Sequence, residues 1–225
     1  MKLEGGYLID GFPSVGLSSV IATESMIQTS QFQLAGIIDS DAFPPISLIK
    51  NGKPNYPTRI FVNDELKVAA FLSHLSIDQS LHRTIARKML EWARKQKISL
   101  IVSSVSIKSD NKNDEIIAVG STERASQKII DLGLKPLKNG TIPGIPGMLL
   151  NEGMLAQQDV IVILFHSDGT SPDFRSSAKL CITISQLIPG ASCDITSLQQ
   201  EAEKIENVIK KDVEESKHLK DSMYR

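Results

Sequence analysis

The stretch YLIDGFPSVGLSSVIATESM, residues 7–26, changes from strand-like to helix-like spacing across one short turn. The apolar run Tyr7–Ile9 predicts a strand, and the residues after 16 place apolar side chains three and four apart, which indicates a helix. A strand that passes through a glycine-bearing turn into a helix is typical of an α/β fold.

The rest of the chain continues this alternation of apolar and amphipathic runs. Seven further short strands are predicted, at Leu34–Ile38, Ile46–Ile49, Ile60–Val62, Val68–Leu72, Ser99–Val105, Ile116–Val119 and Val160–Phe165. The unbroken apolar character of Ser99–Val105 favours a central strand that is covered on both faces. Asn51-Gly52 is a hairpin signal.

Helices are predicted between these strands. Gln79–Lys97 is amphipathic, and Ser121 or Thr122 can cap a helix that ends near Gly133. Ser171-Pro172-Asp173 opens a helix that runs to about Ile188, with Pro172 in its first position. The expected fold class is therefore α/β, with a central mixed β-sheet flanked by helices.

From Asp194 onward the chain is charged and helical in pattern, with a narrow apolar stripe that nearly disappears after Lys210. We expect an α/β domain over residues 1–193, a charged C-terminal helix and flexible tether over 194–222, and a separate terminal segment at 223–225.

Composition excludes several classes of protein. The 225 residues carry 25 Lys and Arg against 26 Asp and Glu, a net charge of -1, which gives no basic surface for nucleic acid. No apolar run is long enough to span a membrane, and the N-terminal run is too short for a signal peptide, so a cytoplasmic protein is expected. We expect Cys181 and Cys193 to be reduced, because two cysteines are too few for a disulfide framework.

The turn after the first strand is the first candidate site. Its residues are Asp10, Gly11, Phe12, Pro13 and Gly16. A glycine-bearing turn before a helix can bind an anion, but this one is neither a dinucleotide fingerprint nor a Walker loop. A structural tight turn is favoured, and a ligand role stays open.

Other candidates for chemistry are weak. Asp39 and Asp41 could act as paired carboxylates, yet two acids before Pro-Pro are also ordinary loop composition. The four histidines, His74, His82, His166 and His218, have no metal-ligand spacing, and no nucleophile elbow is present. We therefore expect no enzyme activity, no metal and no cofactor.

The C-terminal residues Met223, Tyr224 and Arg225 are the most distinctive feature. With three tyrosines in 225 residues, a tyrosine in the penultimate position after an apolar residue is uncommon by chance. An apolar anchor, an aromatic ring and a terminal carboxylate can fill a pocket and pair with a lysine. The alternative is a frayed tail without a role.

The order of short motifs resembles the proteasome assembly chaperone family, especially its archaeal members. The similar segments span nearly the whole chain: GFPSVGL at 11–17, SDAFPP at 40–45, PTRIF at 57–61, LEWA at 90–93, GIPGMLL at 144–150, SPD at 171–173 and EAEKIE at 201–206.

This resemblance implies a nucleoside-phosphorylase-like α/β fold without established catalysis. It also implies an ATP-independent chaperone or activator that binds the α-subunits of the proteasome core particle through a hydrophobic-tyrosine-any motif. Met223 would be the hydrophobic anchor, Tyr224 the aromatic determinant and Arg225 the donor of the terminal carboxylate. A homo-oligomer is implied as well, so that several tails engage one ring.

The sequence leaves two other functions open. One is a small-molecule or nucleotide-binding enzyme of phosphorylase-like or ATP-grasp-like type that uses the Gly11–Gly16 turn. The other is an oligomeric scaffold whose last helix, with its stripe from Ile195 to Ile209, pairs with a partner.

Overall fold

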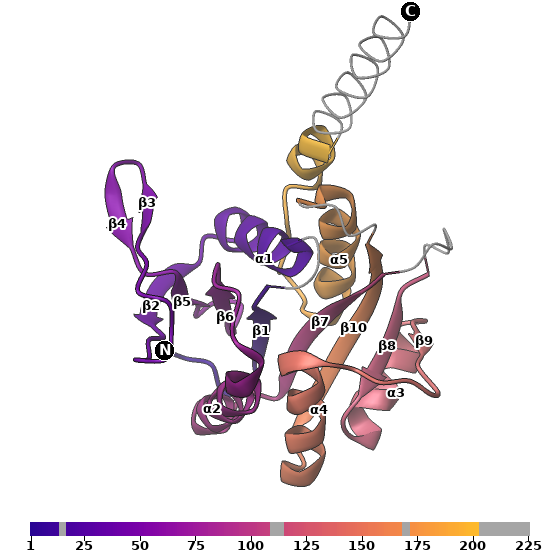
Figure 1. Cartoon of the computed structure of the whole chain (residues 1–225). Coiled ribbons are helices and arrows are strands. Elements are labelled where there is room, and N and C mark those ends of the chain that lie inside the picture. Colours follow the sequence, from indigo (N-terminus) through magenta and orange to yellow (C-terminus); the bar gives the residue numbers. More distant parts are fainter. Residues whose placement is uncertain (14–16, 109–114, 168–171, 203–225) are drawn as a thin grey trace, which may run out of the picture.

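The computed structural model describes residues 1–13, 17–108, 115–167 and 172–202. Its main sheet has eight strands in the order β2-β5-β6-β1-β7-β10-β8-β9 (Figure 1). In that order the strands are Gln33–Ile37, Thr58–Asn63, Val68–Ser73, Tyr7–Gly11, Leu100–Lys108, Asp159–Ser167, Ile117–Gly120 and Lys135–Pro136. Two further strands, β3 (Leu48–Lys50) and β4 (Lys53–Asn55), form a separate hairpin.

The sheet is mixed. Its centre, β6-β1-β7-β10, is parallel. On one side, β5 runs antiparallel to both β6 and β2, and on the other, β8 runs antiparallel to β10 and parallel to β9. The predicted fold class, a central mixed sheet flanked by helices, is confirmed, while the nucleoside-phosphorylase-like comparison stays a prediction.

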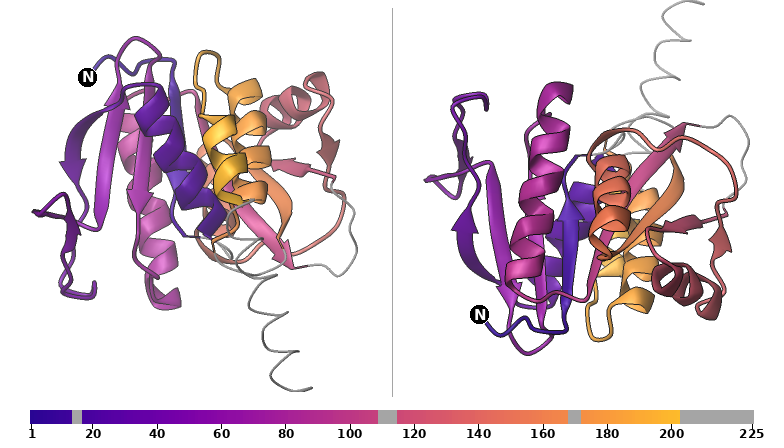
Figure 2. Two further views of the ribbon diagram at one scale, coloured as in Figure 1. Left: turned by 90° about the horizontal axis from the view of Figure 1, so that it is seen from above. Right: turned by 90° about the horizontal axis from the view of Figure 1, so that it is seen from below.

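Helices cover both faces of the sheet (Figures 1 and 2). On one face lie α1 (Ser18–Thr29) and α5 (Phe174–Leu187), and on the other α2 (His82–Lys95) and α4 (Gly144–Ala156). A further helix, α3 (Glu123–Asp131), packs beside β8, and a 3₁₀ turn at Gln79–Leu81 precedes α2. The structure is thus a three-layer sandwich.

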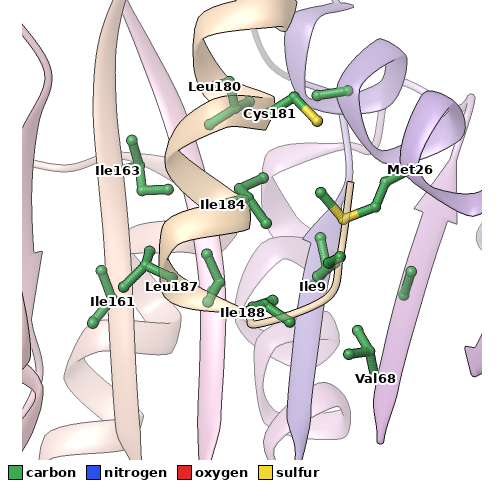
Figure 3. Close-up of a cluster of buried hydrophobic side chains, with 14 of the residues drawn as sticks. Ile9, Met26, Val68, Ile161, Ile163, Leu180, Cys181, Ile184, Leu187 and Ile188 are labelled. Atoms are coloured by element: carbon green, nitrogen blue, oxygen red, sulfur yellow. The ribbon is translucent and has the colours of Figure 1, made fainter. Parts of the chain in front are cut away.

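Two apolar cores separate the three layers. In the first, side chains of the central strands meet α1 and α5, as Figure 3 shows for Ile9, Ile163, Met26 and Ile184. In the second, the alternate residues of the same strands, such as Leu8, pack against α2 and α4. This alternation follows from the two-residue period of a strand.

Local signals in the sequence place several element ends correctly. Asn51 and Gly52 both have positive φ, 53° and 71°, as the tightest hairpin turn requires. The Thr122 side chain accepts a hydrogen bond from the Ala125 amide at the start of α3. Gly133, with φ of 69°, follows the end of that helix.

The predicted start of α5 is wrong by two residues. Asp173 is its N-cap and accepts a hydrogen bond from the Ser176 amide at 2.9 Å, so Pro172 lies before the helix rather than in its first position. The carboxylate accepts a hydrogen bond from a backbone amide that has no partner within the helix. Proline in the first helical position forms no such bond and merely lacks the amide hydrogen.

The expectation that the cysteines are reduced is also wrong. After α5 the chain reverses through Gly190, which has φ of 85°, and brings Cys193 back against Cys181. Their Cα atoms lie 6.3 Å apart, within the range a disulfide bridges, and the two residues are bonded. Counting cysteines could not reveal this reversal.

A helical segment begins at residue 195 and is described as far as 202. The Asp194 side chain accepts a hydrogen bond from the Ser197 amide, and Leu198 and Ala202 are buried. The domain boundary at 193/194 stays a prediction. Among the described residues, no helix has the length and apolar content needed to cross a membrane.

Candidate functional site

The turn after β1 lies at the carboxyl end of the parallel strands, the edge where open α/β sheets bind their ligands. Asp10 and Gly11, predicted as the start of the turn, are instead the last two residues of β1, and Asp10 is 5% exposed. Its Oδ2 accepts a hydrogen bond of 2.6 Å from the Ser103 hydroxyl on β7, and its Oδ1 accepts one of 3.1 Å from the Phe12 amide. Both carboxylate oxygens are therefore held from within the protein.

Burial dominates the titration of this carboxyl. It raises the pKa of Asp10 from 3.8 to about 6, although the hydrogen bonds from Ser103 and Phe12 act in the opposite direction. The group is thus poised to change charge in a mildly acidic range, unlike an ordinary surface aspartate.

The neighbours of Asp10 have clear packing roles. A Cβ at Gly11 would lie 2.7 Å from the Thr23 side chain and 2.8 Å from the Phe71 carbonyl oxygen, so glycine allows α1 to approach the sheet closely. Phe12 is 5% exposed and belongs to the second core, and Pro13 is half-buried. Gly16 lies outside the described residues. These contacts fit the structural interpretation of the turn, and its ligand role stays a prediction.

Buried hydroxyls surround the adjoining helix ends, and sequence reasoning missed them. The hydroxyls of Ser19 on α1 and Ser104 on β7 are 2.8 Å apart, and Ser18 donates to the Asp173 carbonyl at 3.4 Å. Ser176 donates to the His166 carbonyl at 2.9 Å. The signal available in the sequence was the serine-rich end of an otherwise apolar strand.

An apolar cavity of about 600 Å³ lies between α2 and the β2-β5-β6 side of the sheet. Phe71 and Trp92 meet edge to face in its wall, with ring centroids 5.1 Å apart. Asp39 lines the cavity, whereas Asp41 does not. Both aspartates are exposed, so the structure does not join them to buried Asp10 as an acid-base pair.

The histidines are dispersed. His74 Nε2 lies 3.5 Å from Glu24 Oε2, and His82 Nε2 lies 3.1 Å from the Ile77 carbonyl oxygen. Within the described ranges, His166 Nδ1 is buried without a hydrogen-bond partner, and no group of three His, Cys, Asp or Glu side chains could hold a metal ion. His218 lies outside those ranges.

Met223, Tyr224 and Arg225, the predicted partner-binding residues, also lie outside the described residues. Their docking role is neither supported nor contradicted by the geometry, and it stays a prediction.

Comparison with known proteins yields one family and several similar structures. The model of the PAC2 family matches residues 8–213. The crystal structure of Pyrococcus furiosus PbaA, described as an archaeal homolog of proteasome-assembly chaperone, is 27% identical with a TM-score of 0.88, and the match covers 100% of this chain and 94% of PbaA.

Two more distant proteins are similar over most of their length. Pyrococcus furiosus PbaB, described as an archaeal proteasome activator, shares the fold with a TM-score of 0.79 at 20% identity over 94% of each chain. An uncharacterized protein of Methanocaldococcus jannaschii is 24% identical over 220 residues, 98% of this chain and 90% of that protein.

These similarities confirm the resemblance to archaeal proteasome assembly chaperone homologues that the short motifs indicated. Because the family model spans nearly the entire sequence, the chain belongs to the PAC2 family.

Proposed function

We propose that this protein is a non-catalytic, ATP-independent chaperone or activator of a proteasome core particle in the cytoplasm. It acts as a homo-oligomer and binds the α-subunits through Met223, Tyr224 and Arg225. The observation that carries the proposal is the similarity to PbaA, which covers the whole of this chain at 27% identity.

The chemistry of the last three residues supports the docking part of the proposal. An apolar side chain and an amphipathic ring favour a pocket between subunits, and a terminal carboxylate pairs with a lysine at its base. A single tripeptide contact is weak. Several tails on one oligomer convert weak contacts into useful avidity.

The non-catalytic part is supported by the state of Asp10. Its two oxygens are engaged by Ser103 and Phe12, and the side chain is nearly inaccessible. A general base must reach the proton it abstracts, directly or through one water. A carboxyl held in this way is poorly placed to act as a general base, and this supports the non-catalytic part of the proposal.

A binding assay with purified archaeal core particle, without nucleotide, tests the proposal. The full chain is compared with a chain that lacks residues 223–225, with Tyr224→Ala and with Tyr224→Phe. We expect the first two changes to abolish binding to the core particle. The Phe variant keeps the ring but loses the hydroxyl, and so separates apolar docking from hydrogen bonding.

Two results would overturn parts of the proposal. If the full chain does not bind the core particle, the proteasome role is wrong. If the truncated chain binds as tightly as the full chain, the tail has no part in docking. Calorimetric titration of the chain with ATP, with and without core particle, tests its independence from nucleotide.

A further inference from the structure

The two edges of the main sheet are built differently. At one edge, β9 has only two residues, and one of them, Pro136, has no amide hydrogen to offer another strand. At the other edge, β2 has five residues, QLAGI, with no charge and no proline. Proteins normally protect an open edge by short length, charge or proline. The β9 edge has such protection. The β2 edge has neither short length, charge nor proline, and its pairing with β5 is interrupted by one irregularity, between Leu34 and Gly36.

Large apolar side chains are exposed beside the β2 edge. They come from β2 itself, from the segment that follows it, from the β3–β4 hairpin and from Tyr56 directly after the hairpin. Their exposed fractions are 59% for Leu34, 46% for Ile37, 50% for Ile46, 69% for Ile49 and 50% for Tyr56. Single exposed apolar residues are ordinary, but a group of this size along one edge indicates an interaction surface.

The hairpin projects from the body of the molecule (Figures 1 and 2). Its two strands form a sheet of their own, with backbone pairing from Leu48–Asn55 to Lys50–Lys53. An ion pair of 3.0 Å between Lys50 and Glu24 links it to α1. A two-stranded hairpin is at best marginally stable in water. This hairpin therefore gains most if another surface covers it.

The charges beside the edge indicate which surface that is. The hairpin carries Lys50 and Lys53 and no acidic residue, whereas the segment just before it carries Asp39 and Asp41 and no basic residue. Among the described residues, Asp39, Asp41 and Lys53 form no ion pair. A surface that holds unpaired charges of both signs in neighbouring segments is complementary to a second copy of itself.

We propose that β2, the segment 38–47 and the β3–β4 hairpin, here called the β2–hairpin surface, bind a second copy of this chain. The hairpin of each copy packs on the β2 edge of the other, and its Lys53 faces the other copy's Asp39 and Asp41. This proposal rests on the self-association included in the proposed function and identifies where it occurs.

Sedimentation velocity of the full chain at 150 mM salt tests the apolar part of the contact. We expect Leu34→Glu and Ile49→Glu each to raise the dissociation constant for self-association at least tenfold. Leu155→Glu is the matched control, because Leu155 is 76% exposed on α4, away from this surface. A monomeric wild-type chain, unchanged association in both surface variants, or equal dissociation by the control would overturn the proposal.

A charge exchange tests the arrangement of the two copies. Lys53→Glu and Asp41→Lys should each weaken self-association, because each puts like charges opposite one another. An equimolar mixture of the two variants should recover it, since the introduced glutamate of one copy would then face the introduced lysine of the other. Failure of the mixture to recover would overturn this pairing.

Hydrogen exchange separates a lost contact from a misfolded variant. The amides of Gln33–Ile37 should become protected as the wild-type concentration rises, while amides of the central strands stay unchanged in every variant. Protection of β2 that appears only on addition of core particle would assign the surface to the proteasome and overturn the proposal. Because self-association is measured with this chain alone, its failure is distinguishable from failure of proteasome binding.

Discussion

At the level of single residues, Asp10 makes the stability of the protein depend on pH in a direction opposite to most carboxylates. Its pKa is raised from 3.8 to about 6, so the folded state holds a proton that the unfolded state releases between those values. Ionisation of the buried group above pH 6 then costs about 3 kcal/mol of folding free energy.

Asp10→Asn tests this pH dependence. The wild type should lose stability relative to the variant as pH rises from 4 to 6, and the difference should be constant above pH 7. Urea unfolding of both proteins across this range measures it. The interpretation fails if the wild type gains stability relative to the variant over the same interval.

Gly147 is the residue on which the start of α4 depends. A Cβ there would overlap the Ile142 carbonyl oxygen, so the backbone would have to move. We expect Gly147→Ala to lower the free energy of unfolding by about 1–3 kcal/mol. Gly140→Ala is the control in thermal unfolding, because its Cβ would make only ordinary contact, at 3.4 Å, with Leu137.

Single residues were predictable from the sequence when their signal was local. Positive φ at Gly133 and at Asn51-Gly52 is predictable because glycine and asparagine tolerate this backbone conformation and because the neighbouring residues indicate a helix end and a hairpin. The environment of Asp10 depends on Ser103, which is 93 positions away, and no local pattern joins the two. The turn could be selected from sequence, but the burial of its carboxylate could not.

Between elements, Glu24 connects α1 to two other parts of the fold. The hydrogen bond from His74, followed by the interactions with Lys50, lowers the pKa of Glu24 from 4.5 to about 2 despite partial burial. Its contribution to stability is therefore present above pH 4.5 and is lost as pH falls toward 2.

Glu24→Gln should remove this contribution. The difference in stability between wild type and variant should shrink as pH falls from 5 toward 3, and urea unfolding at each pH measures it. Glu91→Gln is the control, because Glu91 pairs with Lys88 at a site where both side chains are mostly exposed, and such pairs contribute little. Equal pH dependence in the two variants would contradict the role of Glu24.

The disulfide between α5 and the following segment makes stability sensitive to reductant. Cys181 and Cys193 are 12 residues apart, and closing a loop of this length stabilises a protein by about 3 kcal/mol. We expect Cys193→Ser to lower the unfolding temperature and to abolish the effect of dithiothreitol. If the unfolding temperature of the wild type is the same with and without dithiothreitol, the disulfide does not contribute to stability.

Elements with a clear period were predicted, and elements without one were missed. The strands Val68–Ser73 and Asp159–Ser167 contain short, almost continuous apolar runs, which are typical of buried strands. In contrast, α4 contains Gly147, Gly153 and Pro146, which are poor helix formers, and its stability comes from packing on α2 and β10. Tertiary contacts that override propensity cannot be deduced from one sequence.

For the whole molecule, self-association and proteasome binding should be coupled through the number of tails. A Leu34→Glu chain that is monomeric keeps residues 223–225 intact, yet it should bind the core particle at least about 100-fold more weakly than the wild type. Surface plasmon resonance on immobilised core particle measures this. Equal affinity of monomer and oligomer would show that one tail is sufficient.

The disulfide has a further, mechanical consequence. The C-terminal helical segment begins two residues after Cys193, so a force applied to this segment passes through the disulfide into α5. The chain between the two cysteines, which are 12 positions apart, bears no tension, and its length of about 40 Å can extend only after the disulfide is reduced. The anchor point of the terminal segment is therefore the sandwich itself rather than a loop that can be drawn out.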